Sequence, residues 1–296
     1  MIMKKRSTFI ALIPPIFFDC VVAITIITGT PNGKPEYQGV GTGFLYGHFL
    51  EKTTEAEPKE RFAIYLVTNK HVLEEVKGKQ VFARLNPEGR EQARNFRLEV
   101  WKPDGTLAWH VHPCADVDVA VIPINVAQLM KEGIRVEYFR SNRDLLNLTK
   151  AAEVGLSEGD GVFVLGYPMG ELGGVRNYVI ARNGSIARIR DAFLGSRKTF
   201  LADAFVFPGN SGGPVVVKPE LVAIDGTKAI NQAYLIGMVK SYLPYTDVAF
   251  SMQTKTPRIV FHENSGLAEI IPIDYITAII EDHRKPALDR MTTCVQ

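Results

Sequence analysis

The 296-residue sequence has few cysteines and no long apolar run, and each shortage narrows what the protein can be. Its three cysteines, Cys20, Cys114 and Cys294, are widely separated and form no C-x-x-C pair, which argues against a disulfide framework and fits a reducing compartment. No uninterrupted apolar stretch reaches the roughly 18–20 residues that a membrane-spanning helix needs. The net charge of +2 gives no reason to expect nucleic acid or an anionic membrane as the main partner.

The N-terminus begins in the manner of a secretory signal, with a basic stretch at 4–6 (KKR) and an apolar one at 9–13 (FIALI). Two prolines then break the apolar run, Asp19 follows, and no small-residue cleavage site comes closely after it. We therefore expect residues 16–27 to form the first strand and the protein to be cytoplasmic, with export as the alternative.

Short β-branched and apolar runs separated by turn residues fill most of the chain. Strands are expected at 16–27, 40–46, 62–68, 80–85, 96–101, 117–123, 162–165, 178–189, 199–202, 215–217, 234–240 and 267–271. Helical patterns occur only at 72–76, 126–132 and 274–281. This predicts an all-β protein with two six-stranded antiparallel barrels and a C-terminal helix. The expected boundaries are 1–124 for the first barrel, 125–160 for a linker with a short helix, 161–272 for the second barrel, and 273–296 for the helix and tail.

One loop, residues 208–214 (PGNSGGP), is unusually rich in residues with special backbone behaviour. It lies between the apolar runs 205–207 and 215–217. A plain turn seldom needs so much glycine and proline, whereas a loop that holds one hydroxyl against backbone N–H groups does. Ser211 is the candidate hydroxyl; the alternative is a glycine-rich hairpin with an incidental serine.

A serine hydroxyl becomes a good nucleophile only when a base takes its proton and a third group orients that base. Of the six histidines, His71 directly follows a strong strand and opens a short helical run, so a rigid element positions its ring. Asp118 stands at the head of an apolar strand, where a charge needs a hydrogen-bonding partner. Asp116 is the reserve candidate, and either acid has the alternative of ordinary loop hydrogen bonds.

A metal site is the rival interpretation of a second group of residues. His110, His112 and Cys114 alternate, so on a strand they would share one face, as metal ligands do. Pro113 interrupts that strand, and no second cluster completes four ligands. A loop before the aspartate strand is therefore favoured over a zinc site.

Three motifs carry a resemblance to a known family. Residues 68–72 (TNKHV), 118–121 (DVAV) and 209–214 (GNSGGP) resemble, in that order, the histidine, aspartate and serine motifs of trypsin-like serine proteases. Residues 41–44 (GTGF), 164–170 (VLGYPMG) and 183–186 (NGSI) are similar to strand motifs of the bacterial trypsin-like peptidase group that includes the high-temperature-requirement proteases. The resemblance runs from about residue 16 to residue 281 and implies a chymotrypsin-like fold.

The resemblance also implies roles for individual residues. Ser211 would be the nucleophile of a serine endopeptidase, His71 its general base and Asp118 the orienting acid, with the N–H groups of Gly209 and Ser211 forming the oxyanion hole. Such an enzyme cleaves polypeptides through an acyl-enzyme and needs no metal or organic cofactor. Asn210 replaces an aspartate that digestive relatives pair with a cleaved N-terminus, so that kind of zymogen activation is not implied. A stand-alone domain without a PDZ module is expected, because only about fifteen residues follow the last helix.

Specificity and activation are less constrained. By resemblance, Phe205 lies at the base of the primary pocket and Lys240, Ser241 and Tyr242 line it; without an acid there, small or apolar side chains are expected before the scissile bond rather than Arg or Lys. The competing class is a catalytically silent or partner-activated fold that acts as a protein-binding module. The presence of all three triad residue types favours the enzyme, and an activating protein partner stays open.

Overall fold

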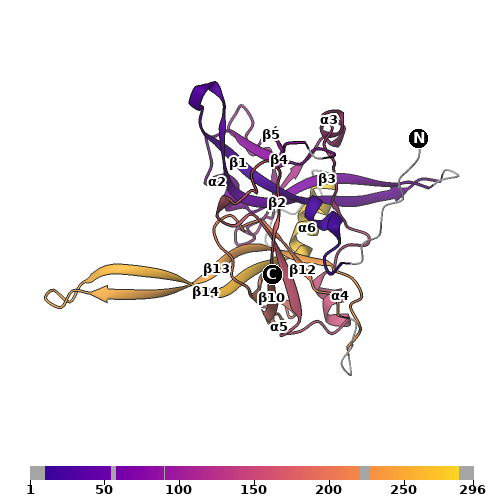
Figure 1. The fold of residues 1–296 in the computed structure, drawn as a ribbon. Helices are drawn as coiled ribbons and strands as arrows, with labels where there is room; N and C mark the ends of the chain where they lie inside the picture. The colour runs from indigo at the N-terminus through magenta and orange to yellow at the C-terminus, as the bar shows by residue number, and fades with distance from the viewer. Residues whose placement is uncertain (1–10, 55–57, 90, 221–226, 287–296) are drawn as a thin grey trace.

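The computed structural model describes residues 11–54, 58–89, 91–220 and 227–286, which form two β-sheet units with short helices around them (Figure 1). The first unit is an eight-stranded sheet in the order β5-β4-β1-β2-β3-β7-β6, with β8 pairing in parallel with β2. Its strands are β1 (Val21–Gly29), β2 (Glu36–Lys52), β3 (Glu60–Thr68), β4 (Val81–Leu85), β5 (Arg94–Leu98), β6 (His110–Val111), β7 (Ala120–Pro123) and β8 (Phe139–Arg140).

This first sheet is not the closed, six-stranded, wholly antiparallel barrel that the sequence predicted. It has eight strands, one of them parallel to its neighbour, and it remains open between β5 and β6. Closure requires a continuous ladder between the end strands, and β6 has only two residues to offer. The open interior leaves a cavity of about 770 Å³ with an apolar wall that includes Leu66, Leu98 and Ile122.

The second unit is a closed barrel of six strands in the order β10-β11-β14-β13-β12-β9, which confirms the prediction for this half of the chain. Buried β-branched side chains such as Val162, Val164 and Val215 fill its centre. Its strands are β9 (Gly161–Gly166), β10 (Ile180–Arg188), β11 (Phe200–Asp203), β12 (Pro214–Val217), β13 (Leu235–Phe250) and β14 (Pro257–Pro272).

Strands β13 and β14 are far longer than the sequence predicted. Each has 16 residues, and their outer halves leave the barrel as a projecting hairpin, orange in Figure 1. We call residues 243–264 the arm. The prediction stopped at 240 and began again at 267 because the arm packs on no core, so its sequence lacks the alternation of buried and exposed residues that marks a strand.

The helices are short. They are α1 (Pro15–Asp19), α2 (Lys70–Glu74), α3 (Val126–Lys131), α4 (Leu148–Glu153), α5 (Arg190–Phe193) and α6 (Ile273–Arg284), with 3₁₀ turns η1 (Pro31–Gly33) and η2 (Pro168–Gly170). Residues 16–19 are therefore helical rather than part of the first strand, because Pro15 occupies the first helical position, where proline is favoured. In the described part of the chain, every helix is too short or too polar to cross a bilayer.

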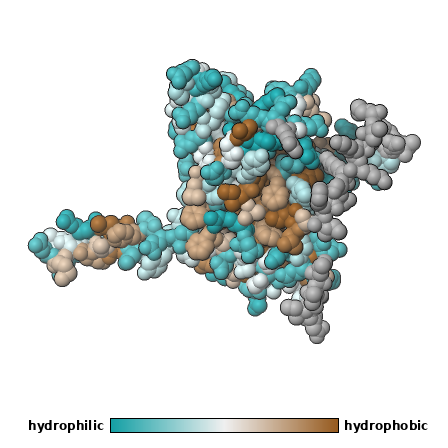
Figure 2. All heavy atoms as spheres, in the orientation of Figure 1, coloured by the Kyte–Doolittle hydropathy of each residue, from teal (hydrophilic) through white to brown (hydrophobic). Residues whose placement is uncertain are grey.

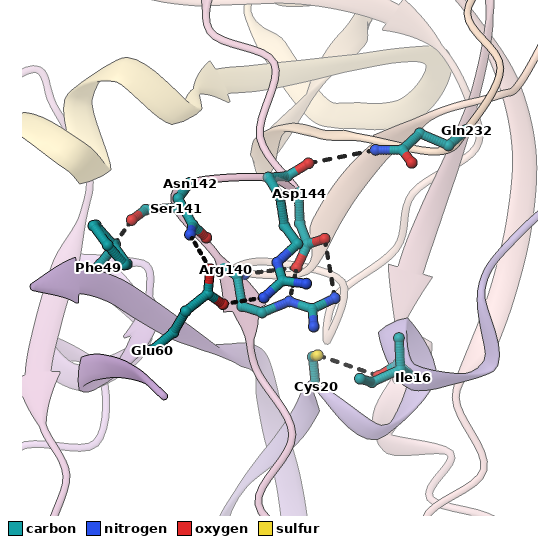
Figure 3. A network of polar contacts seen from close by, with 10 residues as sticks. Ile16, Cys20, Phe49, Glu60, Arg140, Ser141, Asn142, Asp144 and Gln232 are labelled. Atoms are coloured by element: carbon teal, nitrogen blue, oxygen red, sulfur yellow. Dashed lines mark hydrogen bonds and ion pairs between the residues drawn. The ribbon is translucent and has the colours of Figure 1, made fainter. Parts of the chain in front are cut away.

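The segment 139–146 joins the two units. β8 pairs with β2, and a few residues later Leu146 donates to the Leu235 carbonyl at 3.0 Å in β13. Between these points Arg140 and the buried Asp144 form an ion pair, with Nε 2.8 Å from Oδ2 (Figure 3). A buried pair of this kind stabilises one geometry strongly only while both partners remain.

Side chains from the same segment reach further into both units (Figure 3). Arg143 and Asn142 bind the Glu60 carboxylate at the start of β3, and Gln232 donates to the Arg143 carbonyl at 3.4 Å. The segment therefore ties β2 and β3 of the open sheet to β13 of the barrel.

One cysteine departs from the expectation of a chain without disulfides. Cys20 is a buried free thiol, but Cys114 is disulfide-bonded. Cys294 and the signal-like residues 1–10 lie outside the described residues.

Candidate active site

His71 and Asp118 lie at the ends of neighbouring strands. His71 is the second residue of α2, which begins two residues after β3 ends at Thr68. Asp118 lies two residues before β7, which pairs with β3 so that Thr68 faces Ala120. The His71 backbone N–H donates to Asp118 Oδ1 at 3.0 Å, and ring Nδ1 lies 2.5 Å from Oδ2. Both carboxylate oxygens therefore hold the histidine, one through its backbone and one through its ring.

Two further contacts attach the histidine segment to the aspartate segment. Asn69, fully buried, donates from Nδ2 to the Asp118 carbonyl at 2.8 Å, and Lys70 Nζ donates to the Ala115 carbonyl at 2.8 Å. The reserve acid, Asp116, has a side chain that is 82% exposed and lies 3.4 Å from Lys198 Nζ. Of the two acids, the structure brings only Asp118 to His71.

The environment of His71 raises its pKa. Partial burial acts to lower the pKa, because it disfavours the charged ring. The hydrogen bond to Asp118 and the charge of Asp118, helped by Glu75 and Glu74, outweigh that effect and move the pKa above the ordinary 6.5. The ring is therefore a stronger base than a free histidine.

The serine loop needs its glycines. Gly209 and Gly212 have φ values of 96° and 82°, in the left-handed region that favours glycine. A Cβ on Gly209 would lie 2.4 Å from the Tyr167 carbonyl oxygen, and one on Gly212 only 2.1 Å from that of Thr42. The expectation that this loop requires special backbone is confirmed.

Thr42 on β2 connects the serine loop to the first sheet. Its backbone N–H donates to the Ser211 carbonyl at 2.9 Å, and its hydroxyl donates to the Gly209 carbonyl at 2.6 Å while accepting from Tyr167 N at 3.0 Å. Thr68, three residues before His71, donates to the Thr42 carbonyl at 2.7 Å. Thr42 thus couples the histidine segment to the serine loop, and sequence analysis missed it because nothing in the stretch 41–44 distinguishes a buried hydroxyl from an ordinary strand threonine.

His71, Ser211 and Gly209 line one cleft of about 340 Å³ between the two units. The Ser211 hydroxyl donates to the Lys240 carbonyl at 3.4 Å, a long contact. Within the described ranges, no hydrogen bond joins Ser211 to His71, and the backbone N–H groups of Gly209 and Ser211 have no acceptor.

The residues expected to line the primary pocket are only partly assembled. Lys240, Ser241 and Tyr242 line the cleft, but Phe205 does not; Val206 and Phe207 stand there instead. The Phe205 side chain is 55% exposed and lies beside Gly266 at the base of the arm.

Glu269 is a second residue that sequence analysis missed. Its carboxylate accepts from Ser241 Oγ at 2.9 Å and lies 3.4 Å from Lys240 Nζ. The acid therefore compensates the lysine charge at the rim of the cleft. Its only sequence signal was a polar position within the apolar strand 267–271.

The rival metal cluster does not assemble. His110 stacks on His283 with ring centroids 3.5 Å apart, and His112 Nδ1 accepts from the Cys114 N–H at 3.1 Å. Among the residues that the structure describes, no group of three His, Cys, Asp or Glu side chains is arranged to hold a metal ion.

A closed barrel, an open companion sheet and a C-terminal helix form a trypsin-like fold. The family model of the trypsin-like peptidase domain matches residues 41–224, more than half of the chain. The chain therefore belongs to the trypsin-like peptidase family. The matched range includes the histidine, aspartate and serine motifs and ends before β13.

Proposed function

We propose that this protein is a serine endopeptidase with Ser211 as nucleophile, His71 as general base and Asp118 as the orienting acid. The observation that carries the proposal is the pair of hydrogen bonds between His71 and Asp118 beside a cleft that Ser211 also lines. Because Nδ1 is engaged by the carboxylate, Nε2 is the ring nitrogen left for the serine proton.

The proposed reaction has two halves. Ser211 Oγ forms a bond to the peptide carbonyl carbon while its proton passes to His71 Nε2; the C–N bond then breaks, and the amine leaves with that proton. In the second half, water gives a proton to His71 as its oxygen bonds to the acyl carbon. The bond between that carbon and Ser211 Oγ then breaks, His71 returns the proton to Oγ, and the carboxylic acid leaves. Asp118 stays ionised and stabilises the imidazolium formed in each half.

Backbone donors complete the proposed site. The N–H groups of Gly209 and Ser211 flank that of Asn210, which donates to the Phe207 carbonyl at 2.9 Å. Two uncommitted donors separated by a committed one suit an oxyanion hole, where losing one donor lowers the rate by about 10²–10³. The positive φ of Gly209 supports this arrangement.

The alternative is a binding module, or an enzyme that a partner must activate. The contact of Ser211 with the Lys240 carbonyl, in place of His71, is the observation in its favour. Serine–base hydrogen bonds are often loose before substrate binds, so we favour the enzyme.

A fluorophosphonate probe distinguishes these functions. We expect it to label the native protein but neither Ser211→Ala nor His71→Ala. If the native protein is not labelled under conditions that label trypsin, the endopeptidase proposal fails and the binding module is favoured. Labelling of Ser211→Ala would show that another residue reacts.

We further propose that the enzyme is closest to the high-temperature-requirement group and that its substrates are polypeptides with small or apolar side chains before the scissile bond. We propose the cytoplasm as its location, with export as the alternative that the disulfide at Cys114 favours. The proposed division of the chain remains 1–124, 125–160, 161–272 and 273–296. Mass spectrometry of digests would overturn the specificity proposal if every cleavage followed Arg or Lys.

A further inference from the structure

We propose that the arm (residues 243–264) binds an extended apolar segment of the polypeptide substrate, which pairs along β13 on the N-terminal side of the scissile bond. This proposal rests on the endopeptidase function and extends the substrate-binding surface beyond the cleft. Four features of the arm support it.

The first feature is continuity with the cleft. Strand β13 lines the cleft from Val239 to Tyr242 and then runs without interruption into the arm. Ser211 Oγ contacts the Lys240 carbonyl at 3.4 Å, so β13 passes the proposed nucleophile three residues before the arm begins. A chain held in the cleft can therefore extend directly onto the arm.

The second feature is a free strand edge. β12 pairs with β13 only as far as Met238, and the last backbone contacts on that side are those of Val239 with Gly212 and Gly213. From Lys240 outward, no described strand pairs with that edge. Unpaired backbone groups along an edge are what an extended peptide adds to in strand-addition binding.

The third feature is exposed apolar surface on both faces of the arm. Brown atoms on the projecting part of Figure 2 show it on the face turned to the viewer. Ala249 pairs with Ile259 on one face and Val248 with Val260 on the other. Phe250 is 60% exposed and Met252, in the connecting turn, 84%. A two-stranded ribbon is marginal in water by itself, so a third strand that covers these side chains would stabilise it.

The fourth feature is the charge of the arm, which selects among occupants. Its two acids, Asp247 and Glu263, balance its two bases, Lys255 and Arg258. An anionic membrane surface is recognised by clustered basic residues, which are absent from this segment. A neutral apolar strip suits an unfolded polypeptide segment of low charge.

The base of the arm contacts the proposed pocket wall. Asn264 Nδ2 donates to the Val206 carbonyl at 2.6 Å, and Ser265 Oγ donates to the Leu243 carbonyl at 2.6 Å. Val206 itself lines the cleft. These contacts hold the arm in line with the cleft, so that a bound segment stays in register with it.

Geometry gives the polarity and length of the bound segment. β13 runs outward from the cleft, so an antiparallel partner runs inward and places its N-terminal residues at the tip. At about 3.4 Å per residue, the stretch from Lys240 to Phe250 accommodates about ten residues before the scissile bond. Shorter substrates occupy only the cleft.

The test uses two variants with three substitutions each. The arm variant is Phe250→Ser/Ile259→Ser/Phe261→Ser, at exposed positions where the fold does not depend on packing. The matched control, Met130→Ser/Val175→Ser/Leu194→Ser, removes three apolar side chains outside the arm that are somewhat more exposed than those of the arm variant. Each is also made in the Ser211→Ala background, so that binding is measured without cleavage.

Fluorescent β-casein serves as the unfolded, apolar probe. We expect the arm variant to raise its Kd by about tenfold or more, and the control to change it less than about twofold. Cleavage assays use two peptides that share one mapped β-casein site, one with three residues before the scissile bond and one with twelve. The shorter peptide reports on the cleft alone, and the longer one on the cleft and the arm together. The arm variant should lower kcat/KM only for the longer peptide.

The two proposals fail in different ways. Unchanged binding in the arm variant overturns the arm proposal, whatever the serine probe shows. Absent labelling overturns the endopeptidase function on which the arm proposal rests, and β-casein binding that still depends on the arm would then define a binding surface without cleavage. The arm proposal is also overturned if sedimentation shows that the arm substitutions dissociate a dimer, or if the native arm binds vesicles of anionic phospholipid in preference to β-casein.

Discussion

His71 and Asp118 are joined by two hydrogen bonds, from the backbone N–H at 3.0 Å and at ring Nδ1 at 2.5 Å, whereas Asp116 points to Lys198. We expect Asp118→Asn to lower kcat by about 10⁴, because the amide stabilises the wrong histidine tautomer. Asp116→Asn should stay within about threefold of the parent, since an exposed ion pair contributes little. Hydrolysis rates of a peptide substrate measure both, and comparable losses would show that Asp118 is not the orienting acid.

The raised pKa of His71 predicts the pH dependence. The ring must be neutral to accept a proton, so the acid limb of kcat/KM should have its midpoint above the ordinary 6.5. In Asp118→Asn the two contributions of Asp118 that raise the pKa of His71 are lost while burial remains, so the midpoint should move to lower pH. A pH–rate profile checks both, and an unmoved limb in the variant would mean that another group controls it.

The same shift has a consequence for stability. Because the folded-state pKa of His71 lies above its unfolded value, its ionic contribution is fully present below the unfolded pKa and is lost as pH rises through the folded pKa. The loss of unfolding free energy caused by His71→Ala should therefore be largest below pH 6.5 and should shrink as the pH rises through the folded-state pKa of His71. Denaturant titrations at several pH values measure it, and a pH-independent difference would contradict the assignment.

Thr42 is expected to act as a positioning residue for the serine loop. Thr42→Val leaves the buried Gly209 carbonyl and Tyr167 N–H without their partner, which should lower the free energy of unfolding by about 1–3 kcal/mol and slow labelling of Ser211. Thr42→Ser keeps the hydroxyl and should restore the labelling rate. Labelling of the valine variant at the parent rate would restrict Thr42 to a role in stability.

Gly212 and Gly105 provide a matched pair for the loop backbone, because both have a φ of 82°. Gly105→Ala meets open space and should destabilise by about 1–2 kcal/mol from conformation alone. Gly212→Ala adds the overlap with the Thr42 carbonyl and should destabilise by about 1–3 kcal/mol more. Chemical denaturation compares the two, and equal effects would mean that the loop can shift away from Thr42.

Local patterns predicted much of the barrel. The strands expected at 162–165, 199–202 and 215–217 match β9, β11 and β12 closely, because each has a buried face whose apolar residues reveal it. The arm was missed for the opposite reason, since no packing surface shapes its composition. The sequence could not show whether the first sheet closes, because closure depends on whether its end strands, β5 and β6, pair with each other in space.

The sequence by itself determined the candidate residues His71, Asp118 and Ser211, since each stands in a local motif that its chemistry requires, and it determined that the loop at 208–214 needs glycine. Tertiary structure alone decided which of Asp118 and Asp116 lies beside His71, because the pairing of Thr68 with Ala120 sets which carboxylate reaches the ring. It also decided that Thr42 supports the serine loop and that β13 continues beyond the cleft as an exposed arm. These are contacts between segments far apart in the chain, and no local pattern of residues encodes them.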